Sequence, residues 1–261
     1  MEPDSGLSDG TGTNRTRGKE RLDVLVQRLA GVSRAEAQAL ILAGAVYNTK
    51  GQRLDKCGLR LAVDTLLDIR SRRKYVSRGG EKLEAALQAF CISVAGCRAM
   101  DVGASTGGFT DCLLQHGVAK VYAIDVGYGQ LAWKLRTDPR VVVMERTNIR
   151  TVRPEMFDDT IDFFVVDCSF ISLGLVLPCV SNVVCKDAQG VILVKPQFEA
   201  GREKVGKGGV VRDPMVHDEV IERVKGFAVA NGFDVRGVVP SPLLGPSGNR
   251  EFLMYLSTVS S

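Results

Sequence analysis

Two lysines and two acids stand beside apolar segments of this chain, at Lys82, Asp167, Lys195 and Glu251. Asp167 and Lys195 each end an apolar strand, Glu251 directly precedes one, and Lys82 lies on a predicted helix. Ligands of open α/β sheets bind beyond the carboxyl ends of strands, so we expect these side chains to line a ligand site. The acids could orient a lysine and tune its pKa for proton transfer. For any one of them, a solvated strand end or an ordinary helix surface stays open as the alternative.

A glycine-rich turn at residues 103–108 follows an apolar strand and precedes a predicted helix. Its glycines would let the backbone approach a ligand closely. Asp125 ends the next apolar strand, where a carboxylate can accept ribose hydroxyls, and Asn148 follows a third strand. The turn is not Gly-x-Gly-x-x-Gly and no Walker lysine follows it, which favours S-adenosylmethionine over NAD or ATP. The predicted cofactor contacts are Asp101, Gly103, Ala104, Ser105, Gly107, Gly108, Phe109, Thr110, Asp125 and Asn148.

The elements that must position these residues alternate between strands and helices. Apolar strands at 163–166 and 191–194 follow the cofactor segment, and a helix over 214–231 precedes late strands near 235–239 and 252–256. Such alternation predicts an α/β domain with a parallel, helix-covered sheet. A helix over 80–90 leads into the cofactor strand. The apolar run 163–185 is long enough to span a bilayer, but it contains Asp167 and Pro178, so we expect a buried strand followed by a core helix.

The N-terminal third has a different pattern. Residues 1–19 are polar and are predicted to be disordered. Helices are predicted at 21–29 and 34–43, the second with a capping box of Ser33 and Glu36, and short strands at 46–47, 59–63 and 66–69. Residues 70–74 form a short basic linker. We expect a small domain at 20–69 and a larger one at 75–261.

Charge separates the two parts. Residues 1–82 carry 16 Lys and Arg against 10 Asp and Glu, a net +6, whereas residues 83–261 carry 18 against 20, a net −2. A basic module joined to a near-neutral one is typical of a polyanion-docking domain on a catalytic domain, although a solvated basic surface is the alternative. Seven scattered cysteines without a Cys-x-x-Cys pair, and only two histidines, argue against a metal site. They favour reduced thiols in a cytoplasmic protein.

Several segments together resemble the TlyA family. They are residues 21–23, 33–38, 75–83, 101–110, 167–172, 194–199 and 205–214. The resemblance covers about residues 20–257 and implies an N-terminal RNA-binding domain of the ribosomal-protein S-four type, joined to an FtsJ-like Rossmann methyltransferase domain. Members are ribosomal RNA cytidine 2′-O-methyltransferases, some of them called haemolysins. The family's Lys-Asp-Lys-Glu tetrad maps onto Lys82, Asp167, Lys195 and Glu251.

The resemblance implies that a lysine accepts or orients the proton of a ribose 2′-hydroxyl during methyl transfer from S-adenosylmethionine, without a metal. We favour Lys195 as the base and Lys82 as the orienting group, although the sequence leaves this choice open. Ribosomal RNA within ribosomal subunits is the expected partner, and which subunit and cytidine stays open. The expected RNA contacts are Arg21, Arg34, Gln38, Lys56 and Arg78. A glycine-rich loop at 201–213 could close on RNA or be a plain connector. The alternatives of a membrane-active cytolysin or a non-catalytic assembly factor also stay open.

Overall fold

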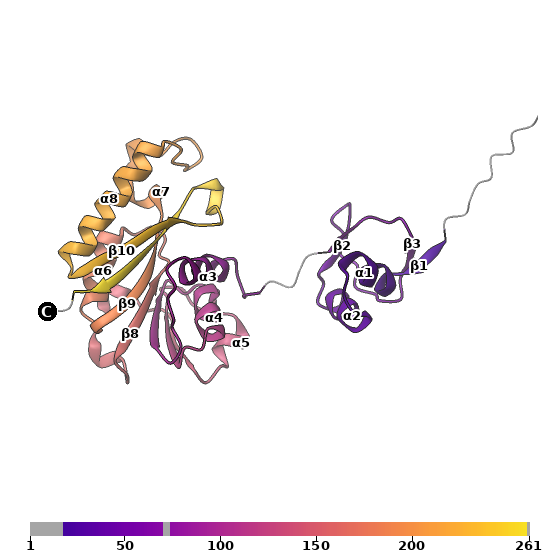
Figure 1. Ribbon diagram of the computed structural model, residues 1–261, viewed down its shortest axis with the longest axis horizontal. Helices are drawn as coiled ribbons and strands as arrows, with labels where there is room; N and C mark the ends of the chain where they lie inside the picture. The colour runs from indigo at the N-terminus through magenta and orange to yellow at the C-terminus, as the bar shows by residue number, and fades with distance from the viewer. Residues whose placement is uncertain (1–17, 70–73, 260–261) are drawn as a thin grey trace, which may run out of the picture. The chain divides into compact units, whose positions relative to one another are not determined.

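The computed structural model describes residues 18–69 and 74–259. The chain divides into two compact units, residues 1–72 and residues 73–261, which we describe separately (Figure 1). Of the predicted leader, residues 1–19, only Gly18 and Lys19 are among the described residues. Of the predicted linker, residues 70–74, only Lys74 is. The exact domain limits therefore stay predictions. The seven cysteines are all free thiols.

The N-terminal unit consists of two helices and two small antiparallel ribbons. Strand β1 (Lys19–Arg21) pairs with β3 (Arg60–Ala62), and β2 (Val46–Asn48) pairs with β4 (Leu67–Ile69). Helices α1 (Leu22–Ala30) and α2 (Arg34–Leu42) bury their apolar faces against each other and the ribbons. The predicted capping box is confirmed, because the Ser33 side chain accepts from Glu36 N while the Glu36 carboxylate accepts from Ser33 N.

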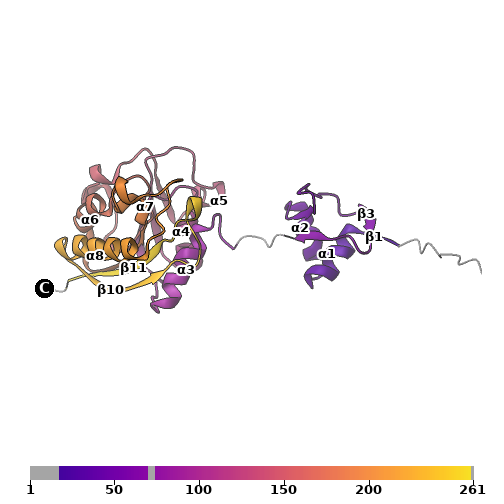
Figure 2. The same cartoon turned by 90° about the horizontal axis from the view of Figure 1, so that it is seen from above.

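The larger unit has three layers, with helices on both faces of one sheet (Figures 1 and 2). The sheet has the order β10-β11-β9-β8-β5-β6-β7. Its strands are β5 (Arg98–Val102), β6 (Lys120–Ile124), β7 (Val141–Met144), β8 (Ile161–Val166), β9 (Val184–Val194), β10 (Phe233–Pro240) and β11 (Phe252–Thr258). Two apolar clusters, one on each face, bury the sheet.

Helices α3 (Gly79–Ala89), α4 (Gly108–Gln115) and α5 (Trp133–Arg136) pack on one face. Helices α6 (Leu173–Ser181), α7 (Pro196–Glu199) and α8 (Pro214–Ala230) pack on the other. Short 3₁₀ turns are η1 (Ile149–Thr151), η2 (Pro154–Met156), η3 (Arg202–Lys204) and η4 (Pro246–Gly248). This arrangement confirms the predicted α/β class.

The expectation of a wholly parallel sheet is wrong in one respect. Strand β11 runs antiparallel to both of its neighbours, β9 and β10. The physical reason is the connection from β10 to β11, which has no crossover helix of the kind that a parallel pair requires. The reversal has a consequence for the site, because Phe252 pairs with Val194. The residues just before β11 therefore lie beside the residues just after β9.

The long apolar run divides as the sequence predicts. Residues up to Val166 complete strand β8, and helix α6 begins at Leu173 and contains Pro178. Within the described parts of the chain, no helix combines the length and the apolar character needed to cross a membrane.

Candidate active site

The strand order reverses between β5 and β8, and this is the position where open α/β sheets bind ligands. Two cavities open at this carboxyl edge, and both are lined by Gly103, Ser105, Asp167 and Ser169. The first, of about 430 Å³, contains the predicted catalytic residues and is called the lysine cavity below. The second, of about 550 Å³, extends past Asp125 and Asn148 and is called the nucleoside cavity.

All four residues of the predicted tetrad line the lysine cavity. Lys82 Nζ donates to Glu251 Oε2 over 2.5 Å, and Lys195 Nζ lies 2.6 Å from Asp167 Oδ1. Both lysines are less than a tenth exposed and Glu251 is fully buried, so solvent screens these pairs weakly. Lys82 lies on helix α3. Glu251 directly precedes strand β11, and the antiparallel direction of β11 places Glu251 at this edge of the sheet. The structure therefore forms two ion pairs on one cavity wall rather than a single alternating chain.

Ser169 is a contact that the sequence analysis missed. Lys195 Nζ donates to Ser169 Oγ over 2.8 Å, in addition to its ion pair with Asp167. A lysine nitrogen has three positions beyond its carbon stem; Ser169 occupies one through a hydrogen bond and Asp167 lies beside it as an ion-pair partner, so a position is left for a ligand in the cavity. The sequence signal was available, because Ser169 stands two residues after Asp167 in the same strand-end loop.

Asp125 organises the wall between the glycine turn and the nucleoside cavity. Its Oδ2 accepts from Ser105 N over 2.8 Å, and its Oδ1 accepts from Gly127 N over 2.7 Å. Each carboxylate oxygen keeps a second lone pair, so the group can still accept from ribose hydroxyls. Asn148 also lines this cavity, but its side-chain oxygen accepts from Arg150 N and caps η1.

The glycines of the turn are also required by packing within the protein. Gly103 has φ of 85°, and a Cβ there would lie 2.6 Å from the backbone oxygen of Asp167. A Cβ on Gly107 would lie 2.2 Å from Leu135, and one on Gly108 would lie 2.2 Å from Ser77 Oγ. Because glycine has no Cβ, the turn can pack closely against Asp167, Leu135 and Ser77.

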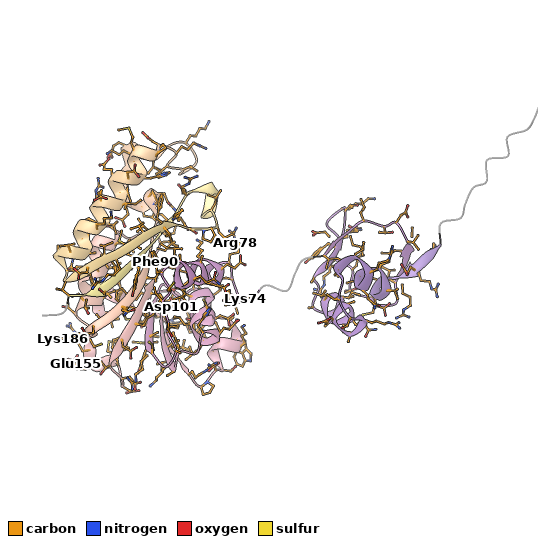
Figure 3. The ribbon with its side chains drawn as sticks, in the orientation of Figure 1. Lys74, Arg78, Phe90, Asp101, Glu155 and Lys186 are labelled. Atoms are coloured by element: carbon orange, nitrogen blue, oxygen red, sulfur yellow. The ribbon has the colours of Figure 1, made fainter. Side chains whose placement is uncertain are left out.

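Two predicted cofactor contacts lie below the surface. Asp101 and Thr110 are fully buried, line neither cavity, and are joined by a 2.6 Å hydrogen bond from Thr110 Oγ1 to Asp101 Oδ2. Figure 3 labels Asp101 in the interior of the unit. Burial, with a smaller contribution from the Asp167 charge, raises the pKa of Asp101 to about 7. In the structure, Asp101 and Thr110 connect strand β5 to helix α4 beneath the turn.

The other predicted cofactor contacts lie where a ligand can reach them. Ala104, Gly108 and Phe109 line the lysine cavity, and Ser105 lines both cavities. Gly103 also lines both, whereas Gly107 lines neither and packs against Leu135.

Three of the predicted RNA contacts meet around one buried carboxylate that the sequence analysis missed. Asp23 is fully buried and accepts from Arg21 Nε at 3.0 Å, from Gln38 Nε2 at 3.0 Å and from Arg34 at 3.2 Å. The bond from Arg21, followed by those from Gln38 and Arg34, holds the pKa of Asp23 well below its usual range. Both arginine side chains stay about half exposed, so the cluster displays two oriented guanidinium groups.

The remaining predicted RNA contacts lie on two different units. Lys56 is exposed and precedes Cys57, whose backbone oxygen accepts from Asp23 N, so it adjoins the arginine cluster. Arg78 is exposed at the start of α3 and lines the lysine cavity. The loop 201–213 contains η3 and a bridge between Gly206 and Val210, and its far end is held by Asn249.

The residues at this edge fit S-adenosylmethionine. The Asp125 carboxylate, which has free lone pairs, lines a cavity large enough for a nucleoside. Residues of the glycine turn line both this cavity and the lysine cavity. Glu251 Oε1 is buried without a hydrogen-bond partner among the described residues, as expected of a pocket whose ligand completes it. No cluster of three or more metal-ligating side chains occurs in residues 18–69 and 74–259.

A Rossmann-like sheet with a glycine turn, a carboxylate on the second strand and paired lysines defines a methyltransferase of the nucleoside-cofactor type. The FtsJ-like methyltransferase model matches residues 75–258, and the chain belongs to this family. The chain is 50% identical to YqxC of Bacillus subtilis, over 92% of this chain and 86% of that protein.

Two further comparisons cover both units. The chain is 49% identical to the 16S/23S rRNA (cytidine-2′-O)-methyltransferase TlyA of Mycobacterium tuberculosis, over 92% of this chain and 90% of that one. A solved structure from Streptococcus thermophilus, described as a hemolysin candidate, superposes with a TM-score of 0.72 at 46% identity. It covers 94% of this chain and 90% of the other.

Proposed function

We propose that the protein transfers a methyl group from S-adenosylmethionine to the 2′-hydroxyl of cytidine in ribosomal RNA. The observation that carries the proposal is the pair of lysines, each held by its own carboxylate, on the wall of one cavity. A ribose hydroxyl is a weak nucleophile that must be oriented and must lose its proton. The named substrate of the 49% identical relative supports ribosomal RNA and cytidine as the target.

In this proposal each residue of the tetrad has one task. As the neutral amine, Lys195 directs its lone pair at the hydroxyl and takes up its proton, while Lys82 orients the ribose from the same cavity. Asp167 and Ser169 fix the direction of Lys195, and Glu251 fixes Lys82. S-adenosylmethionine supplies the methyl group, and Asp125 with the glycine turn holds it in place.

The N-terminal unit is proposed to bind RNA as a domain of the S-four type. Its support is the net +3 of residues 1–72, which carry 12 Lys and Arg against 9 Asp and Glu, and the two half-exposed arginines held by Asp23. Arginine forks suit phosphate oxygens, and such contacts position an enzyme on RNA without specifying sequence. Ribosomal subunits in the cytoplasm are the proposed setting.

The experiment is in vitro methylation of small and large ribosomal subunits from cells that lack this gene. Labelled S-adenosylmethionine is added, and the digested RNA is mapped by mass spectrometry. We expect 2′-O-methylcytidine in one or both RNAs with the wild-type protein and none with Lys195→Ala. Methyl groups on bases, or no transfer to either subunit, would overturn the proposal.

A further inference from the structure

A third cavity of the larger unit lies next to the lysine cavity and belongs to neither site described above. It measures about 390 Å³ and shares no lining residue with the lysine or nucleoside cavity. We call it the arginine cleft, after Arg212 and Arg250 on its walls. Its other lining residues are Val210, Val211, Pro214, His217, Leu244, Ser247 and Gly248.

The arginine cleft lies next to the tetrad, because one of its lining residues is adjacent in sequence to a tetrad residue. Arg250 lines the cleft, whereas the next residue, Glu251, lines the lysine cavity. The same turn supplies Gly245 to the lysine cavity and Leu244 to the cleft. A polymer whose reacting nucleotide occupies the lysine cavity would therefore pass its neighbouring backbone along the cleft.

The walls of the cleft are held by buried polar groups. Asn249 is 2% exposed; its Oδ1 accepts from Val211 N at 3.0 Å and its Nδ2 donates to Gly209 O at 2.8 Å. His217 Nε2 donates to Val211 O at 3.0 Å from helix α8. These bonds join the loop that carries Arg212 to the turn that carries Arg250, so both arginines project from fixed backbone.

The charges of the cleft are not used within the protein. Arg212 and Arg250 are both exposed, and neither has an ion pair or hydrogen-bonded partner within residues 18–69 and 74–259. The nearest carboxylate along the chain, Asp213, accepts from Met215 N and caps helix α8. Two free guanidinium groups on a rigid frame suit a diester anion.

The apolar lining of the cleft indicates which part of an RNA strand can bind there. Val210, Pro214 and Leu244 are aliphatic, and the lining includes no aromatic ring apart from the buried His217. Single-stranded bases bind proteins mainly by stacking on aromatic side chains. The cleft therefore suits a sugar–phosphate backbone better than a stacked base.

We propose that the arginine cleft binds the phosphodiester backbone of the RNA strand beside the nucleotide being methylated. This inference rests on the proposed function. Arg212 and Arg250 each contact a phosphate oxygen, while Val210, Pro214 and Leu244 contact ribose. The cleft thus holds the strand in register with the lysine cavity, and the N-terminal unit binds RNA independently of it.

The test is the salt dependence of ribosomal RNA binding by the full-length protein, measured by filter binding. Each phosphate contact that is lost should lower the steepness of log K against log salt concentration by about one. We expect the slope of Arg212→Gln/Arg250→Gln to fall by about 2 relative to the wild type, with affinity for S-adenosylmethionine unchanged. Arg212→Lys/Arg250→Lys should keep a slope near that of the wild type, because its charges remain.

The matched control is Arg153→Gln/Lys186→Gln, which removes the same charge from two other exposed positions. Lys186 lies at the opposite end of the unit from Arg78, which lines the lysine cavity (Figure 3). A glutamine variant of the cleft that behaves like this control, or one that loses affinity without a change in slope, would overturn the inference. Because binding is measured without methyl transfer, failure of the wild type to methylate would count against the proposed function alone.

Discussion

Ser169 Oγ lies 2.8 Å from Lys195 Nζ and accepts one of its three protons. Asp167 Oδ1 lies 2.6 Å from the same nitrogen as its ion-pair partner, so the nitrogen keeps a position directed toward the cavity that Ser169 and Asp167 line. A lysine on a four-carbon stem would otherwise sample many rotamers. The serine and the carboxylate together therefore convert a flexible cation into an oriented group.

Replacement of this hydroxyl should slow methyl transfer without affecting the cofactor. We expect Ser169→Ala to lower the single-turnover rate roughly fivefold, since one hydrogen bond contributes about 1 kcal/mol. Ser169→Thr keeps the hydroxyl and should recover most of the rate. Equal rates for the alanine variant and the wild type, at saturating RNA and cofactor, would show that Asp167 alone orients Lys195.

The Asp125 carboxylate should contribute directly to cofactor affinity. Asp125→Ala removes the acceptor for ribose hydroxyls and frees the backbone N–H groups of Ser105 and Gly127. We expect binding to weaken by at least about 1.5–3 kcal/mol in calorimetry. Asp158→Ala is the control, because the Asp158 side chain is 91% exposed. An unchanged affinity in a folded Asp125→Ala protein would remove Asp125 from the cofactor site.

The buried Asp23 should stabilise the N-terminal unit. Asp23→Asn removes the charge that pairs with Arg21 and Arg34 and leaves two cations without a partner. We expect a loss of roughly 1–3 kcal/mol in the free energy of unfolding, seen as faster amide hydrogen exchange in α1 and α2. The exposed Asp55 provides the control variant Asp55→Asn. Unchanged exchange in α1 and α2 would contradict the organising role of Asp23.

Asp101 should make stability depend on pH in a direction opposite to that of most carboxylates. Its pKa is raised from 3.8 to about 7 by burial, so the native protein holds a proton that the unfolded chain releases in that range. The stabilisation is complete below about pH 4 and is lost as the pH rises through about 7. Between pH 5 and pH 8 the wild type should lose about 2–3 kcal/mol that Asp101→Asn does not lose.

Urea unfolding followed by circular dichroism at the two pH values measures this difference. The comparison with Asp101→Asn isolates Asp101 from other groups, such as Glu199, whose pKa burial also raises. If both proteins lose the same stability between pH 5 and pH 8, Asp101 is ionised in the native state throughout.

Much of the site could be predicted from residue types beside apolar segments. A charged residue at the carboxyl end of a buried strand lies where open α/β sheets bind ligands, and this pattern identified Asp167 and Lys195. Glu251 was selected because it directly precedes an apolar strand, and its place beside Lys82 depends on the antiparallel β11. Strand direction is set by the connections and by packing, neither of which the local pattern of apolar residues records.

Other features of the site depend on tertiary packing, which the sequence pattern does not record. The glycines at 107 and 108 were interpreted as making room for a ligand; the structure adds their close approach to Leu135 and Ser77, while Gly108 also lines the lysine cavity. Asp101 is one residue from the cavity wall in sequence but points into the interior, where Thr110 binds it. The arginines of the N-terminal unit were recognised by charge alone. Their common partner, Asp23, is separated from Arg34 and Gln38 by 11 and 15 positions.

Whether Lys195 acts on the reacting hydroxyl can be decided in a single kinetic experiment. That measurement is the single-turnover transfer of labelled methyl from S-adenosylmethionine to ribosomal RNA by Lys195→Ala. We predict a loss of more than about 10²-fold in rate, with cofactor and RNA affinities close to those of the wild type, because general-base and positioning contributions vanish together. A folded Lys195→Ala protein that transfers methyl groups at the wild-type rate would contradict the account and leave Lys195 as a structural partner of Asp167.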